Sequence, residues 1–97
     1  MIVGIYHNIS DPQKFGEVAK KIDGLIKENK LPNGIKALTF APSTDGRKAF
    51  CLWEVDSLNS LRSFLEPWTG SVSRNEYFEV DTGKAEGLPH EMMAHAT

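Results

Sequence analysis

The sequence predicts a single α+β domain in which strands and helices follow one another in the order βαββαβ. The chain has 97 residues, 40 % of them hydrophobic, which suits one hydrophobic core. Apolar residues recur at helical spacing in two segments, and β-branched or aromatic runs bounded by turn residues occupy most of the rest. We therefore expect one domain over residues 1–88 and a C-terminal tail over residues 89–97.

The first strand and the first helix are predicted near the N-terminus. Residues 2–8 are β-branched and aromatic, and they predict a strand. Asp11 and Pro12 then supply an N-cap and a first helical residue. Gly16 and Gly24 lower the intrinsic helix propensity of the segment that follows, so we interpret them as sites of close packing onto the sheet. The apolar stripe of this helix consists of Phe15, Val18, Ala19, Ile22, Leu25 and Ile26.

A β-hairpin is predicted in the middle of the chain. Residues 35–40 and 48–55 have strand-like composition, and Asp45-Gly46 between them is a turn signal. Because the side chains of a strand alternate between its two faces, the pairing register decides which residues share a face. Pairing placed symmetrically about Asp45 puts three pairs opposite each other: Lys36 with Glu54, Leu38 with Leu52, and Phe40 with Phe50.

A second helix and a last strand complete the pattern. Asp56-Ser57 is the expected cap, and the helix should end near Pro67 because the proline ring removes a backbone donor. Residues 76–80 form the expected last strand. This order predicts a ferredoxin-like fold, with a four-stranded antiparallel sheet in the order 4-1-3-2 and both helices on one face.

The face of the sheet away from the helices is predicted to be apolar. Its apolar area is on the order of several hundred Å², which is more than a soluble monomer usually exposes. We therefore expect a second copy of the chain to cover it in a two-fold homodimer. The residues assigned to this face are Ile2, Tyr6, Leu38, Phe40, Phe50, Leu52 and Tyr77.

Four aromatic residues on that face form the candidate binding site: Tyr6, Phe40, Phe50 and Tyr77. Two interpretations stay open. They can line a pocket between the sheets for a small apolar or aromatic ligand, with the phenols as hydrogen-bonding groups. They can equally form the core of the dimer interface, where aromatic residues are enriched without any ligand.

Three other groups of residues carry weaker signals. Glu54 and Lys36 are interpreted as a cross-strand ion pair, with Glu54 as a general base as the alternative. The strand alternation puts His7 on the helix side, where it either orders the turn near Asp11 or moves protons. Cys51 is expected to be a small buried core residue, because the pattern places no histidine to activate it.

Charge and motif content exclude several classes of function. The formal net charge of −2 argues against a nucleic-acid partner, and no apolar run suits a membrane span or a signal peptide, so we expect a cytoplasmic protein. His90 and His95 resemble a zincin motif with one residue too many, which turns the two imidazoles about 140° apart on a helix. We therefore expect no metal, and the sequence indicates no cofactor.

The chain resembles the dimeric α/β-barrel proteins, in which two ferredoxin-like subunits face each other. The segment AFCLWEVDSLNSLRSFLEPW resembles the third strand and second helix of that superfamily, and NEYFEV resembles its last strand. The likeness covers about residues 1–88 and is closest to the small DUF3303-like members. The resemblance implies the fold and a homodimer. The alternative that it implies is a cofactor-free enzyme of the antibiotic-biosynthesis-monooxygenase type, acting on an aromatic or polyketide-like compound.

Overall fold

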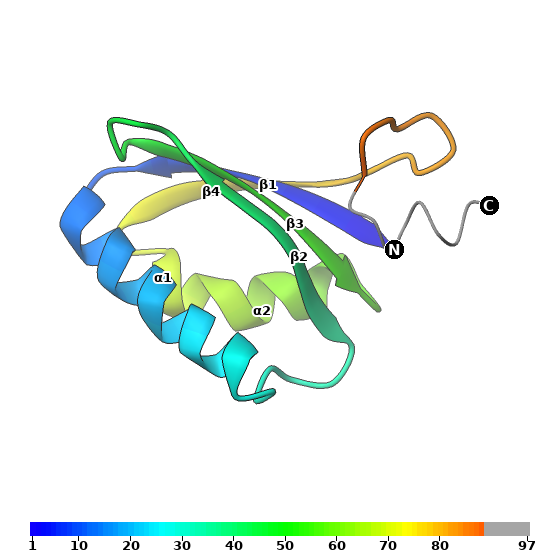
Figure 1. The fold of residues 1–97 in the computed structure, drawn as a ribbon, viewed down its shortest axis with the longest axis horizontal. Helices are drawn as coiled ribbons and strands as arrows, with labels where there is room; N and C mark the ends of the chain where they lie inside the picture. The colour runs from blue at the N-terminus through cyan, green and yellow to red at the C-terminus, as the bar shows by residue number, and fades with distance from the viewer. Residues whose placement is uncertain (89–97) are drawn as a thin grey trace.

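The computed structural model describes residues 1–88 and has the predicted βαββαβ order (Figure 1). Within this part of the chain, neither helix is long and apolar enough to cross a bilayer. The elements are β1 (Ile2–Ile9), α1 (Pro12–Lys27), β2 (Ile35–Pro42), β3 (Lys48–Val55), α2 (Leu58–Thr69) and β4 (Ser73–Glu79).

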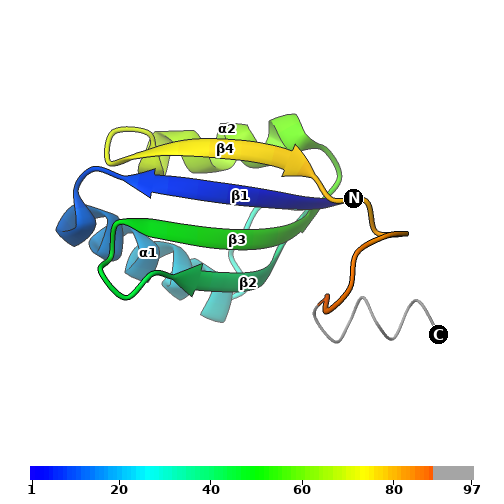
Figure 2. The ribbon, with the colours of Figure 1, turned by 90° about the horizontal axis from the view of Figure 1, so that it is seen from above.

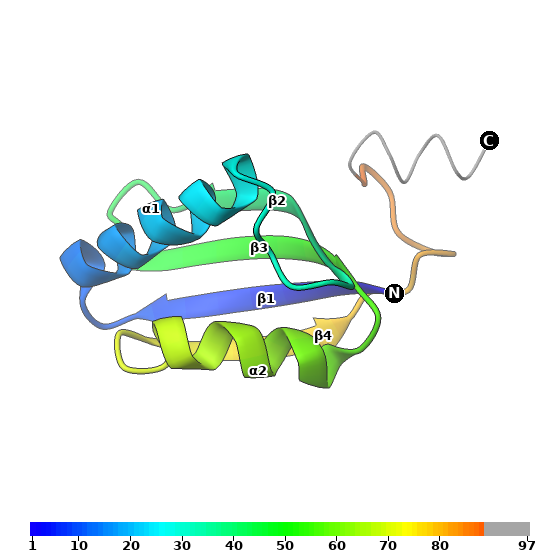
Figure 3. The ribbon, with the colours of Figure 1, turned by 90° about the horizontal axis from the view of Figure 1, so that it is seen from below.

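The four strands form one antiparallel sheet in the order β2-β3-β1-β4, which confirms the predicted fold and strand order. Both helices lie on the same face of this sheet (Figure 1). Helix α1 crosses the side formed by β2 and β3, and α2 runs along the side of β4 (Figures 2 and 3). Each helix thus covers its own half of the sheet.

Helix α1 begins where the sequence predicts. The Asp11 side chain accepts a hydrogen bond from the Lys14 backbone N–H over 3.1 Å, and Pro12 occupies the first turn. The prediction for its two glycines is wrong, because a Cβ atom on Gly16 or Gly24 would meet nothing within 4 Å. The glycines therefore do not mark close packing of α1 onto the sheet.

Helix α2 extends further than predicted. Ser57 caps it by accepting from the Ser60 N–H over 3.1 Å, but the helix continues through Pro67 to Thr69. A proline this close to the end of a helix removes only one late intrahelical hydrogen bond, so the last turn can form around it. The following strand also starts earlier than expected, at Ser73.

The hairpin has the predicted register only at the end away from its turn. Lys36 lies opposite Glu54 as predicted, but a β-bulge at Leu38 separates this stretch from the rest of the ladder. Beyond the bulge the pairs are shifted by one residue, so that Thr39 lies opposite Leu52 and Phe40 opposite Cys51. The predicted pairs of Leu38 with Leu52 and of Phe40 with Phe50 are wrong, because an extra residue in one strand reverses the faces beyond it.

The core lies between the sheet and the helices. Its buried residues come from β1, β3, the start of β2 and both helices: Val3, Ile5, Ile22, Ile35, Cys51, Trp53, Val55, Leu61 and Leu65. The residues that alternate with these core residues along each strand face away from the helices. We call this side of the sheet the open face. By register the open face carries Ile2, Gly4, Tyr6, Phe50, Leu52 and Phe78.

Candidate functional site

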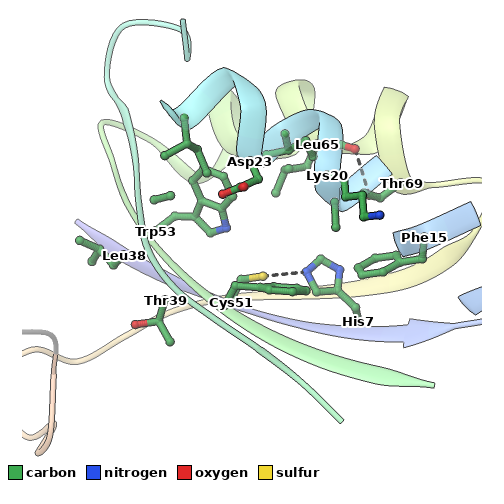
Figure 4. Close-up of a pocket in the computed structure, with 15 residues that line it drawn as sticks. His7, Phe15, Lys20, Asp23, Leu38, Thr39, Cys51, Trp53, Leu65 and Thr69 are labelled. Atoms are coloured by element: carbon green, nitrogen blue, oxygen red, sulfur yellow. Dashed lines mark hydrogen bonds between the residues drawn. The ribbon is translucent and has the colours of Figure 1, made fainter. Parts of the chain in front are cut away.

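A cavity of about 470 Å³ lies between helix α1 and the sheet (Figure 4). Its volume falls in the range of small-molecule sites, which is about 300–1,000 Å³. The wall is mostly apolar, and α1, β1, β2, β3 and α2 all contribute to it. The lining residues on which the following argument depends are His7, Phe15, Phe40, Cys51, Trp53 and Thr69.

The mouth of the cavity opens between α1 and the edge strand β2. Lys20, Asp23 and Ile26 of α1 line it and are exposed. On the opposite side Phe40 is half exposed and stacks with Phe15, with the ring centroids 6.5 Å apart. An apolar aromatic pair therefore borders the entrance, together with a lysine and an aspartate.

Trp53 lines the inner part of the cavity. Its side chain is almost fully buried and packs edge-on against Phe64, with ring centroids 6.4 Å apart. The indole nitrogen Nε1 is on the side of the ring that faces the cavity (Figure 4). Among residues 1–88 it is the one buried side-chain nitrogen or oxygen with no hydrogen-bond partner. A buried donor without an acceptor costs about 1–3 kcal/mol.

His7 reaches the cavity from β1 and is 3 % exposed. One ring nitrogen, Nδ1, lies 2.6 Å from Asn75 Oδ1, and the other, Nε2, lies 3.2 Å from Cys51 Sγ. Asn75 Nδ2 donates to Glu66 Oε2, which can only accept, so Asn75 Oδ1 must be the acceptor toward His7. The network thus assigns the proton to Nδ1 and leaves Nε2 to accept from the Cys51 thiol.

The Cys51–His7 pair is neutral at neutral pH. Burial lowers the pKa of His7, and the hydrogen bond to Asn75 and the charge of Glu66 oppose that shift. Burial raises the pKa of Cys51 to about 12. The nearby Trp53 N–H opposes the rise in the pKa of Cys51, although its geometry is not that of a hydrogen bond.

The polar network continues away from the cavity under α2. Glu66 Oε2 accepts from Asn75 Nδ2 and from the Tyr77 hydroxyl, each over 2.6 Å. Burial raises the pKa of Tyr77, and its hydrogen bond to the Glu66 carboxylate adds to the shift. Thr69 Oγ1 also accepts from Asn75 Nδ2 and donates to the Leu65 carbonyl. These bonds hold His7 in one orientation and one tautomer.

The structure brings together only two of the four aromatic residues expected on the open face. Tyr6 and Phe50 lie in contact there, with ring centroids 5.2 Å apart. Phe78, which the sequence analysis did not include, stacks on Tyr6 at 5.7 Å. Its ring lies over Gly4, where an added Cβ would collide with it. The aromatic group on this face is therefore Tyr6, Phe50 and Phe78.

The placement of Phe40 and Tyr77 on the open face is wrong. The bulge at Leu38 turns Phe40 to the helix side, where it borders the cavity. Tyr77 pairs with the core residue Ile5, so its ring also faces the helices. The face on which Tyr77 lies depends on how β4 pairs with β1. No local turn signal in the sequence specifies that pairing.

The expectations for His7 and Cys51 are partly wrong. His7 lies on the helix side as predicted, but it binds Asn75 and Cys51. Cys51 is buried as predicted, yet it does have a histidine beside it. The missed signal is the β1–β4 register, which places His7 directly opposite Asn75.

The remaining candidates contribute little to a binding site. Lys36 and Glu54 are cross-strand neighbours near the N-terminus, away from the cavity. Within residues 1–88, no three histidine, cysteine, aspartate or glutamate side chains gather as a metal site requires. The motif containing His90 and His95 lies outside the described residues.

Comparisons with known proteins support the fold. No family model matches the chain, and no curated protein matches it. Among solved structures, the chain is similar to that of Rv0793 from Mycobacterium tuberculosis, with a TM-score of 0.52 and 13 % sequence identity. The match covers 89 % of this chain and 97 % of that one. At this identity the likeness shows a shared small α+β fold and nothing about activity.

Proposed function

We propose that this protein binds a small, flat and largely apolar compound in the cavity between α1 and the sheet. The observation that carries the proposal is the cavity itself, which lies beneath helix α1 in the described part of the chain. Aromatic side chains at the mouth and the buried wall suit a ring compound. The site differs from the one expected between two sheets, although Phe40 belongs to both.

A fluorescence titration with 1-aminoanthracene tests this site. We expect saturable binding of about one probe per chain, with emission that rises as the probe enters an apolar environment. Ala19 lines the cavity, so Ala19→Phe should fill it and abolish binding. Glu17→Phe is the matched control, because Glu17 is an exposed residue of the same helix outside the cavity wall.

Two outcomes would contradict the proposal. One is the absence of saturable binding to the wild-type protein. The other is binding that survives Ala19→Phe but is lost in Tyr6→Glu, which would place the ligand on the open face instead.

A second candidate function is a cofactor-free enzyme that acts on an aromatic or polyketide-like compound. The specific observation in its favour is the fixed His7 imidazole in the cavity wall, oriented by Asn75 and ultimately by Glu66. A histidine held in one tautomer by a second residue is the arrangement of a general base. To act on a ligand, His7 Nε2 would give up its hydrogen bond to the Cys51 thiol and accept a proton from an acidic group of the substrate.

Proton exchange measures this activity without requiring the natural substrate. We expect the protein to accelerate deuterium incorporation at the acidic carbon of 2-tetralone in D₂O, followed by NMR. His7→Gln should remove the acceleration, and Tyr6→Phe on the open face should retain it. An exchange rate equal to that in buffer would leave ligand binding as the proposed function and exclude proton abstraction from this ketone.

We also propose that the open face joins two chains in a homodimer. Tyr6 is 52 % exposed and Phe78 is 39 % exposed, and the Tyr6 ring contacts both Phe50 and Phe78. Contiguous aromatic residues of this kind are typical of association surfaces. Light scattering at micromolar concentration should give twice the chain mass of 10.8 kDa. Tyr6→Glu should halve it, whereas Ser63→Glu on the exposed side of α2 should not.

A further inference from the structure

We infer that the compound bound in the cavity carries a carbonyl oxygen, or another acceptor without a proton, that binds to the indole N–H of Trp53. This inference rests on the proposed function, because it specifies the chemistry of the ligand for the same cavity. It starts from the balance of hydrogen-bond donors and acceptors in the buried wall.

Trp53 contributes a donor that the described protein leaves unused. The indole nitrogen can only donate, and it faces the cavity from a side chain that is 5 % exposed (Figure 4). Satisfying this group requires an acceptor within the cavity. A ligand that brings one gains a hydrogen bond that is made in an apolar environment, where competing water is scarce.

The other buried polar side chains of the wall are already engaged. His7 bonds to Asn75 through one ring nitrogen and to Cys51 through the other. Thr69 Oγ1 donates to the Leu65 carbonyl and accepts from Asn75 Nδ2. With these bonds in place, the buried side chains offer no free acceptor for a hydroxyl proton of the ligand, and the Asp23 carboxylate lies at the exposed mouth. The inner end of the cavity therefore favours a ketone over the corresponding alcohol.

The position of Trp53 directs the ligand oxygen to the inner end of the cavity. Trp53 and Cys51 are two residues apart on the same face of β3, so the oxygen lies beside the thiol. The apolar rings of the ligand then extend toward Phe15 and Phe40 at the mouth. This orientation matches a flat aromatic ketone in which the carbonyl group is the only polar group.

Three compounds with one ring skeleton test the inference: 9-fluorenone, fluorene and 9-fluorenol. They differ only in carrying a carbonyl, a methylene or a hydroxyl group at the same carbon. Equilibrium dialysis should show that the protein binds fluorenone about five- to tenfold more tightly than fluorene, which corresponds to one ordinary hydrogen bond. Fluorenol should bind less tightly than fluorenone, because its proton finds no free acceptor at the inner end of the cavity.

Two variants locate the preference at the indole nitrogen. Trp53→Phe keeps an aromatic ring but removes the donor, and we expect it to bind fluorenone and fluorene equally. Trp68→Phe is the control, because Trp68 packs against the core without lining the cavity. It should retain the preference for fluorenone.

An infrared measurement supports the test if Trp53→Phe does not fold. The carbonyl stretch of fluorenone bound to the wild-type protein should move to lower frequency than in a hydrocarbon solvent, as expected for a hydrogen-bonded carbonyl. Equal affinity of the wild-type protein for fluorenone and fluorene, or an unshifted carbonyl band, would overturn the inference while the cavity remains a binding site. Failure of all three compounds to bind would instead count against the proposed function.

Discussion

The two helices cover the same sheet in different ways. Helix α2 buries Leu61 and Leu65 almost completely and joins β4 through Glu66 and its hydrogen bonds to Asn75 and Tyr77. Helix α1 is longer, yet only Phe15 and Ile22 of its sixteen residues are buried, and the cavity lies beneath it. Both helices have an apolar stripe. An apolar stripe therefore shows which side of a helix faces the sheet, but not whether the space between helix and sheet is filled.

The largest difference between the two helices should appear on truncation of a core leucine. Leu61→Ala removes a fully buried side chain from close packing under α2, and we expect the free energy of unfolding to fall by about 3 kcal/mol. Ile22→Ala on α1 should cost less, about 1–2 kcal/mol, because Ile22 already borders empty space. Urea denaturation measures both values. Equal losses would mean that α1 is packed as closely as α2.

Acid should destabilise the protein through His7, a buried residue of the inner strand β1. Because burial lowers the pKa of His7 in the folded state, the unfolded chain binds the proton more readily. The contribution of His7 to stability is complete above pH 6.5, the ordinary pKa of histidine, and is lost as the pH falls below that value.

A series of urea titrations from pH 8 to pH 5 measures this effect. The wild-type protein should lose more stability over this range than His7→Gln, which has no titrating group at the position. Parallel pH profiles for the two proteins would show that His7 is not kept neutral by burial.

A smaller loss is expected from the hydrogen bond that ties β4 to α2. Tyr77→Phe removes the hydroxyl that donates to Glu66, which should lower the free energy of unfolding by about 1 kcal/mol. Tyr6→Phe is the matched change on the open face, where we expect a difference within about 0.5 kcal/mol. Thermal unfolding at neutral pH compares the two, and a larger loss for Tyr6→Phe would contradict the assigned faces.

The smallest effect should be a gain in stability on α1. Gly16→Ala and Gly24→Ala each add a methyl group to open space in a helix, so each should raise the free energy of unfolding by about 0.5–1 kcal/mol. Gly34→Ala is the contrasting variant, because Gly34 has a φ of 80° and a Cβ there would collide with Asp56. It should be destabilising. A loss in both α1 variants would show that the glycines do contact the sheet.

Local signals in the sequence were enough to predict the elements and their order. The Asp11 cap, the Asp45-Gly46 turn and the apolar stripes act over a few residues, and each lies in the element expected from it, although the register next to the turn is shifted by one residue. The candidate site depends on registers between distant strands, and no short pattern determines these. Asn75 was therefore missed as a partner of His7, and Tyr77 was assigned to the wrong face.

The cavity was harder still to predict, because it reflects a separation between two elements. Periodicity shows that Ala19 and Ile22 face the sheet, but it carries no information on the distance between α1 and β2. Trp53 belongs to the core between the sheet and the helices. Its indole nitrogen has no hydrogen-bond partner because of where Cys51 and α1 lie in three dimensions. The alternation of side chains along a strand cannot predict this.

The bulge at Leu38 also affects how this chain should be aligned with others. Because β2 has one residue more than β3 between the same two flanking pairs, a relative that lacks the bulge is one residue shorter at this point. An alignment that places the gap in the loop after Pro42 would equate Phe40 with a residue of the open face. Placing the gap at Leu38 keeps the residues at the cavity mouth in one column. Relatives are then compared at the entrance of the site and not on the far side of the sheet.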